Sequence, residues 1–289
     1  MIKKVIPVLL SSMLLLTACS NSNTTKNDEN SNMKLTYSNL IDNPTQDQVR
    51  DILIDNKIDK EDADYFIKLV KDYNDKSHIN KLGTSKEGFT SIKTQQVQYD
   101  EGSLGEIWDY NKLNYMDFNC RLTSFTLFKD FIKSEEKFKG DDINLMFDID
   151  AIENNPISKF TKEETNKFIN LYASISVENS QDVEKHAQSI IKEWEKRKIS
   201  FVDNSKISMI NVFLHAPEDE NVFVGHTGIL IKTKEGLLFI EKYGPSLPYQ
   251  VSKFKDKEEL KTYLMDRLDV NTADNEASKP IIMENDKNI

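Results

Sequence analysis

The stretch NVFVGHTGILIKT, residues 221–233, decides the fold that this sequence predicts. It is rich in β-branched and aromatic side chains, and turn residues separate it from two similar runs, KISMINVFLHA at 206–216 and GLLFIEKY at 236–243. Runs of this composition and spacing predict consecutive antiparallel strands. The short gap at Lys234 and Glu235 further predicts that the second and third strands form a hairpin.

Most of the chain before these strands has helical patterning. Apolar residues recur every three or four positions, which predicts helices starting after Asn43 and at about 60–73, 120–132, 161–175, 181–197 and, beyond the strands, 257–268. Residues 88–113 show no clear hydrophobic periodicity, which predicts loop with short extended pieces. Residues 134–160 are rich in charge, which predicts a solvated excursion of the chain away from the core. Helices followed by a sheet favour an α+β fold.

The N-terminus has the layout of an export signal. Two lysines precede an apolar run at 5–16, which is shorter than the ~20 apolar residues of a membrane-spanning helix. The sequence Leu-Thr-Ala-Cys at 16–19 resembles the lipobox of bacterial lipoproteins, which are cut before the cysteine and lipidated on it. We therefore expect residues 1–18 to be a signal peptide and Cys19 to carry the lipid that holds the protein on the outer face of the cytoplasmic membrane.

Composition divides the rest of the chain into three parts. Residues 19–33 comprise the lipidated cysteine and a polar tether, which has too few apolar side chains to order itself. No cluster of Pro, Gly or Ser divides residues 34–270, so they predict one domain with a substantial core. Residues 271–289 are polar apart from three apolar side chains at 281–283 and predict a disordered tail.

Charge and motif spacing disfavour several classes of ligand. The formal net charge of -10 argues against nucleic acid, because phosphate binding needs a basic patch. The sequence contains no zinc-ligand spacing and no glycine-rich phosphate loop. The acidic segment 141–155 lacks the glycine and spaced oxygen ligands of a calcium loop. We therefore expect neither a metal nor a cofactor.

Cys120 lies in FNCRLTSFTLF at 118–128 and is the only cysteine beyond the first twenty residues. It is predicted to begin a hydrophobic helix that Asn119 caps. Free amides at a helix N-terminus lower the pKa of a thiol and can also hold an oxyanion. The alternative is that Cys120 is a small apolar side chain in the core, since free cysteine is among the most buried residue types.

A cysteine nucleophile needs a base, which is usually a histidine. Of the four histidines, His78 and His186 are predicted to lie on the surface and His215 in a loop at a strand end. His226 differs because it is the one ionisable residue in the middle of a β run and has a glycine on either side. Its alternative interpretation is a core histidine with satisfied hydrogen bonds.

The predicted hairpin supplies a third group for this site. A two- or four-residue turn at Lys234 and Glu235 places Tyr243 opposite His226, with Glu241 one diagonal step away on the same face. Diagonal neighbours lie ~7–8 Å apart, within reach of a long carboxylate. A three-residue turn would place Glu241 on the other face, and the alternative role for Glu241 is an exposed charge.

These residues resemble a known superfamily. A cysteine at a helix start, then a histidine and an acid on successive strands, is similar to the papain-like cysteine hydrolases, including their bacterial cell-wall peptidase and amidase branch. NCRLTSF with HTGILI and GLLFIEKYGPSLPYQ also looks like an uncharacterised family of bacterial surface lipoproteins, over most of residues 35–255. The resemblance implies papain-like helices packed on the sheet, with Cys120 as nucleophile, His226 as base and Glu241 as the acid that orients the ring.

The same resemblance implies an oxyanion hole formed by the Cys120 amide and Asn114. The chain departs from the superfamily in two respects: the cysteine lacks the usual glycine and tryptophan neighbours, and the acid is a glutamate. These departures bear on the reaction more than on the fold.

Two functions fit the sequence. The first is a membrane-anchored thiol-dependent amide hydrolase or transferase that acts on peptidoglycan stem peptides or surface peptides. The second is a catalytically inactive surface lipoprotein that binds a partner through the same groove. The second predicts that Cys120 is buried and unreactive and that His226 and Glu241 do not converge on it.

Overall fold

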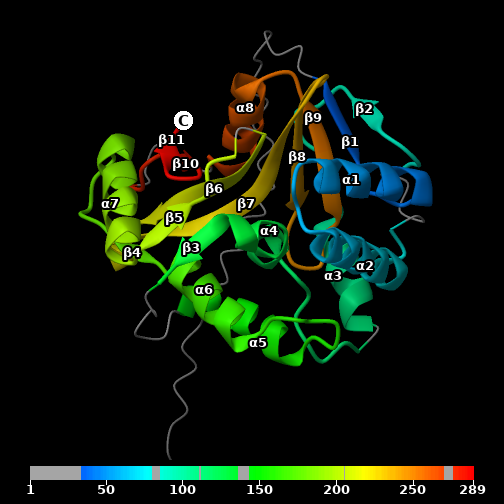
Figure 1. Cartoon of the computed structure of the whole chain (residues 1–289), viewed down its shortest axis with the longest axis horizontal. Helices are drawn as coiled ribbons and strands as arrows, with labels where there is room; N and C mark the ends of the chain where they lie inside the picture. The colour runs from blue at the N-terminus through cyan, green and yellow to red at the C-terminus, as the bar shows by residue number, and fades with distance from the viewer. Residues whose placement is uncertain (1–33, 80–84, 111, 136–142, 205, 270–275) are drawn as a thin grey trace, which may run out of the picture. The chain divides into compact units, whose positions relative to one another are not determined.

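The three predicted strands form the centre of an antiparallel sheet in the computed structural model (Figure 1). They are β6 (Ile207–Ala216), β7 (Asn221–Thr233) and β8 (Gly236–Lys242). The structure describes residues 34–79, 85–110, 112–135, 143–204, 206–269 and 276–289. The predicted signal peptide, lipidation site and tether all lie outside the described residues.

The large sheet extends well beyond the predicted strands. Its order is β11-β10-β6-β7-β8-β9-β1-β2, and β4 pairs separately with β7. The added strands are short and come from distant parts of the chain: β1 (Leu35–Ser38), β2 (Thr90–Ile92), β4 (Ile175–Ser176), β9 (Tyr249–Phe254), β10 (Ile281–Glu284) and β11 (Lys287–Asn288). Two further strands, β3 (Ile132–Ser134) and β5 (Ile199–Phe201), form a small sheet of their own.

Helices form at the predicted places. They are α1 (Asn43–Asp55), α2 (Lys60–Ser77), α4 (Cys120–Phe128), α6 (Lys162–Tyr172), α7 (Val183–Lys196) and α8 (Lys257–Leu268). A capping box starts α6, with reciprocal bonds between Thr161 and Glu164. The prediction of loop over 88–113 was wrong in part, because α3 (Glu101–Tyr110) lies there and its few apolar positions give only a weak period.

The helices cover the sheet from both sides (Figure 1). α8 packs its buried side chains Leu260, Tyr263 and Leu264 on one face, against apolar residues of β6, β7 and β8. The other face carries the larger core, to which α1, α2, α4, α6 and α7 contribute. The architecture is therefore mixed α+β with an antiparallel sheet, as the sequence predicts.

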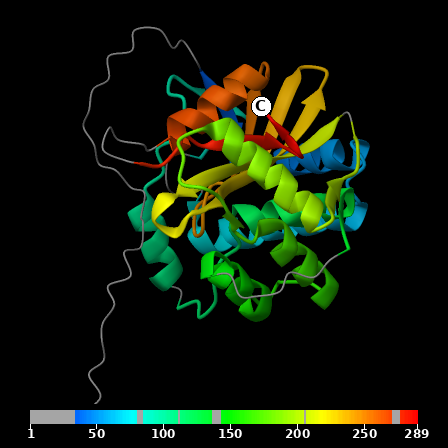
Figure 2. The same ribbon diagram turned by 90° about the vertical axis from the view of Figure 1, so that its left-hand side faces the viewer.

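Two segments expected to be solvated are instead packed. The prediction of a disordered tail at 271–289 was wrong for its end, because β10 pairs with β6 and buries Ile281, Ile282 and Met283. Figure 2 shows these strands between α7 and α8. The predicted excursion at 134–160 contains η3 (Ile143–Leu145) and α5 (Met146–Asn154), whose Asp148 is fully buried. In both segments a few apolar residues among polar neighbours are enough to pack against the rest of the fold.

The β7–β8 hairpin leaves a gap that matters for the site. The hairpin has the predicted two-residue turn, with Thr233 opposite Gly236, and its last pair is Gly228 with Glu241. β7 continues beyond that pair to Asn221, so its first seven residues have no β8 partner along that edge. β4 pairs with Asn221 and Val222, and the start of α4 lies against the open stretch that follows, where Arg121 donates to the Val224 carbonyl.

Candidate functional site

Cys120 is the first residue of α4, at its N-terminus. Asn119 is the cap, and its Oδ1 accepts a hydrogen bond of 3.0 Å from the Leu122 amide. The first amides of a helix have no acceptor within the helix, so the Cys120 N–H points out of the helix start. The Cys120 side chain is 8% exposed and forms no disulfide. The helix therefore presents the thiol and a free amide at one point.

Arg121 fixes this helix start against the open edge of β7. Its Nη1 donates to the Val224 carbonyl at 2.9 Å, and its Nε donates to Asp148 Oδ1 at 3.0 Å. The same Asp148 oxygen accepts from the Asn119 side chain at 2.7 Å. Asp148 thus ties together the cap residue and the neighbour of Cys120, which is why the buried position of α5 matters to the site.

His226 and Glu241 form a buried pair beside the thiol. His226 Nε2 lies 2.6 Å from Glu241 Oε2, and the two side chains are 3% and 0% exposed. His226 also lies close enough to Cys120 for each group to shift the pKa of the other. Because Nε2 is engaged with the carboxylate, Nδ1 is the nitrogen left for the thiol. The structure therefore brings Cys120, His226 and Glu241 together in one chain of contacts.

Glu241 receives several further donors. Tyr263 donates its hydroxyl to Oε1 at 2.6 Å, and Gln250 Nε2 donates to the same oxygen at 3.3 Å. Arg267 Nη1 donates to Oε2 at 2.7 Å. Since each oxygen has at least two donors, the carboxylate is held in one orientation facing His226.

The pKa values of Cys120, His226 and Glu241 are all shifted by their mutual contacts. Burial pushes the pKa of Cys120 up, but His226 and then Arg121 outweigh it, so the pKa lies below the ordinary value. Burial and Arg267 lower the pKa of His226, but Cys120 and Glu241 outweigh them and raise it overall. Burial opposes ionisation of Glu241, yet Arg267 and His226 leave its pKa lowered. These directions favour a thiolate beside an imidazolium.

A second buried charge lies on the opposite face of β8. Lys242 is fully buried, donates to Asp117 Oδ2 at 2.7 Å and also donates to the Leu247 carbonyl. Its Nζ lies 3.6 Å from the ring centroid of Tyr73. Burial lowers the pKa of Lys242 to about 8 despite Asp117. This pair joins the turn after β8 to the segment that leads into Cys120.

The remaining predicted site residues lie elsewhere. Asn114 is exposed on the connection between α3 and α4, and within the described chain it is not a hydrogen-bond partner of Cys120, His226 or Glu241. Trp108 is buried, with its ring centroid 6.2 Å from that of Tyr73 and 6.4 Å from that of Tyr115. Trp108 is therefore a core side chain packed between Tyr73 and Tyr115.

Two other histidines are less exposed than predicted. His186 is 1% exposed and its Nε2 lies 2.6 Å from the Ser180 carbonyl, while His215 lies within β6 and is 7% exposed. Their ring centroids are 4.5 Å apart. The predictions of a surface position for His186 and of a loop for His215 were wrong, because charged neighbours in sequence do not reveal which helix face packs.

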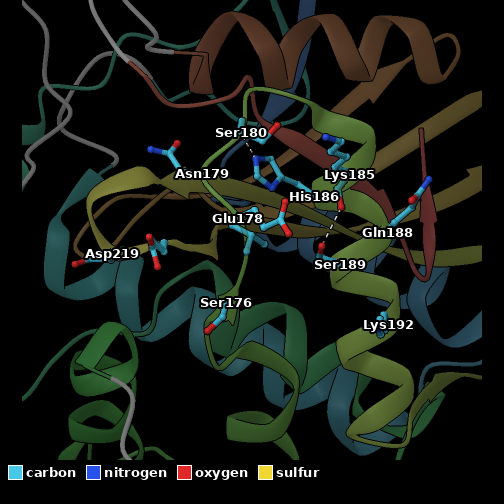
Figure 3. A pocket seen from close by; sticks show the side chains of 12 residues that line it. Ser176, Glu178, Asn179, Ser180, Lys185, His186, Gln188, Ser189, Lys192 and Asp219 are labelled. Carbon is cyan, nitrogen blue, oxygen red and sulfur yellow. Dashed lines mark hydrogen bonds between the residues drawn. The ribbon is translucent and has the colours of Figure 1, made fainter.

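A polar cavity of about 770 Å³ lies beside His186, between α7 and the segment 176–180. Figure 3 shows Lys185, Ser189 and Lys192 of α7 along it and the bond between His186 and Ser180. None of Cys120, His226 and Glu241 lines this cavity. In the described residues, moreover, no group of three or more His, Cys, Asp or Glu side chains could hold a metal ion.

Sequence reasoning missed three residues that support the site: Asp148, Arg267 and Lys242. Arg267 and Tyr263 are four residues apart and so share one face of α8, which is a detectable pattern, but nothing local indicates that they meet Glu241. Asp148 lies in a segment with several other acidic residues, so the sequence does not distinguish it from them. Glu241 and Lys242 are adjacent and so point to opposite faces of β8, and both are fully buried, which their charge does not predict.

Comparison with known proteins places the chain in a family. Neither the curated proteins nor the solved structures include a match to it. Within the described residues no helix has the length and apolar character needed to cross a membrane. Residues 36–289 match the family defined by a domain of unknown function, DUF4300, and the chain therefore belongs to that family.

Proposed function

We propose that this protein is a thiol-dependent amide hydrolase or transferase with Cys120 as nucleophile. The observation that supports the proposal is the chain of contacts from Cys120 through His226 to Glu241, with 2.6 Å between the last two side chains. Nucleophile, base and orienting acid in hydrogen-bond sequence are the arrangement that activates a thiol.

In this proposal the Cys120 thiolate attacks an amide carbon and forms a carbon–sulfur bond. The free amide of Cys120, at the helix start, donates to the oxygen that gains negative charge. The His226 imidazolium transfers its proton to the leaving amine as the carbon–nitrogen bond breaks, and Glu241 keeps the ring in place. Water, for hydrolysis, or a second amine, for transfer, then releases the acyl group from sulfur.

The proposed substrates are peptides of the cell wall or cell surface. Support comes from the predicted lipidation of Cys19, which would place the domain on the outer face of the membrane, and from the polar residues 20–33. Fourteen flexible residues have a root-mean-square reach of ~20 Å. A domain on such a tether meets stem peptides and exposed protein segments near the membrane.

Release of amino groups from purified peptidoglycan and from synthetic stem peptides tests this proposal. We expect the wild-type protein to release them, Cys120→Ala to abolish release, and His226→Ala to slow it at least about 10²-fold. Ser124→Ala is the matched control, because it removes one buried atom from the same helix and should leave the rate unchanged. No release from any substrate, together with a thiol that alkylates as slowly as core cysteine, would contradict the proposal.

One observation favours the second candidate function, an inactive protein that binds a partner. Cys120 is only 8% exposed and His226 only 2%. A buried cysteine is what this second function predicts. The convergence of His226 and Glu241 on Cys120 is opposite to what it requires. Retention of a surface peptide without its cleavage, unchanged in Cys120→Ala, would favour binding.

A further inference from the structure

We infer that Arg267 of α8 is a positioning residue of this site, which holds the Glu241 carboxylate against His226 and shares its negative charge. The inference rests on the proposed function and deepens it, because it identifies what regulates proton transfer at the same three residues. Arg267 is not one of the three proposed catalytic residues, Cys120, His226 and Glu241.

The first support is the geometry around one oxygen. Glu241 Oε2 lies 2.6 Å from His226 Nε2 and 2.7 Å from Arg267 Nη1. The same Nη1 lies 3.5 Å from His226 Nε2. Arginine and histidine therefore share one carboxylate oxygen, so the permanent charge of Arg267 acts directly on the protonation of His226.

The second support is that the arginine side chain is fixed by separate contacts. Arg267 Nη2 donates to the Tyr243 carbonyl, and the guanidinium carbon lies 3.4 Å from the Tyr243 ring centroid. The side chain is only 10% exposed. A planar fork that bonds in two directions and stacks on a ring is a geometry that lysine cannot reproduce.

The third support is the low exposure of the whole cluster. Glu241 is fully buried and His226 is 3% exposed as a side chain, so water screens their charges weakly. With Arg267 present, the negative charge of the Glu241 carboxylate interacts with two cations, Arg267 and the His226 imidazolium. This limits how strongly Glu241 stabilises the imidazolium, so His226 can still give up its proton to a leaving amine.

The consequence is a defined change in pH dependence when the arginine charge is removed. Without Arg267, the full charge of Glu241 acts on His226, and the imidazolium becomes more stable. The thiolate–imidazolium pair should then persist to higher pH, because His226 loses its proton less readily. The alkaline limb of the pH profile of thiol reactivity therefore moves up and the acid limb does not move down, whereas a purely structural role would reduce the rate without moving either limb.

The experiment measures alkylation of Cys120 by iodoacetamide against pH, followed by mass spectrometry in the full chain, for the wild-type protein and for Arg267→Gln, Arg267→Met and Arg267→Lys. We expect the alkaline limb in the two neutral variants to move about one pH unit up. Lysine keeps the charge and should therefore keep the wild-type limb, but it lacks the planar fork and should lower the rate. Methionine keeps an apolar side chain beside the Tyr243 ring, so one neutral variant still tests the inference if the other does not fold.

Arg50→Gln is the matched control, since Arg50 is also an ion-paired arginine but lies on α1 and pairs with Asp64. It should leave both limbs unchanged. A wild-type profile with a depressed thiol pKa but no movement in either neutral variant would overturn the inference alone. A wild-type thiol that titrates like free cysteine would overturn the proposed function and the inference together.

Discussion

At the scale of single residues, Gly228 makes room for the site. It lies opposite Glu241 and two residues from His226 on the same face of β7. A Cβ at this position would overlap the Phe239 ring and lie 2.8 Å from the Ile240 carbonyl oxygen. The glycine therefore leaves room for the Phe239 ring, whose centroid lies 6.5 Å from that of His226.

Gly228→Ala should destabilise the protein by about 1–3 kcal/mol, the typical cost of overpacking. It should also slow the alkylation of Cys120, because the His226–Glu241 contact shifts with β8. Gly105→Ala is the control, since nothing lies within 4 Å of a Cβ built on that helical glycine. Urea unfolding compares the two variants, and equal stability would show that the strands adjust without cost.

Much of the site could be predicted at this scale. The hairpin turn fixes the register of β7 and β8, so the relation of His226 to Glu241 follows from a count of residues. The position of Cys120 at a helix start follows from a cap residue before an apolar stripe. Arg267 could not be predicted, because its contact with Glu241 depends on how α8 docks across the sheet.

At the scale of elements, the buried pair of Asp117 and Lys242 joins the turn after β8 to the start of α4. Asp117 also accepts from the Ser246 amide at 3.1 Å, and Tyr73 donates to the Ser246 carbonyl at 2.9 Å. Both charges are buried, so each depends on the other for stability.

Lys242→Met should lower stability by about 3–5 kcal/mol, because it leaves the Asp117 charge buried without its cation. The double variant with Asp117→Asn should recover most of that loss. Lys60→Met is the control, since Lys60 is 68% exposed in its ion pair and should change stability by less than ~1 kcal/mol. Chemical unfolding of the four proteins measures these values, and a double variant as unstable as the single one would contradict this account of the pair.

Short strands are the elements that the sequence predicted least well. β1, β9 and β10 have four to six residues each, so they contain too few positions to show a period. Their partners are also distant in sequence, as in the pairing of Thr36 with Lys253. Tertiary pairing, rather than local preference, decides such strands.

At the scale of the whole molecule, the two ends of the described chain complete the fold. β1 pairs with β9 on one side of the central strands, and β10 pairs with β6 on the other. A contact just before β10 reports on this closure, because the Ser278 amide donates to His215 Nδ1 at 3.0 Å. A protonated Nδ1 cannot accept this bond.

Acid should therefore weaken the closure. Burial and then His186 lower the pKa of His215 from its ordinary 6.5, so the unfolded chain binds the proton more readily. Stability is complete above about pH 6.5 and is lost as pH falls through the lower pKa of the folded protein. His215→Gln should unfold with less dependence on pH between 7.5 and 5, and the exposed His78→Asn should behave as wild type. Equal acid sensitivity in all three proteins would exclude His215 as the source.

The measurement that tests the central claim most directly is the apparent pKa of the Cys120 thiol, from the pH dependence of its alkylation in folded protein. The account predicts a value well below the ~8.5 of free cysteine, and a rise toward or above that value in His226→Ala. A thiol that does not react in folded protein, or that reacts identically with and without His226, would show that Cys120 is a core side chain and would contradict the claim.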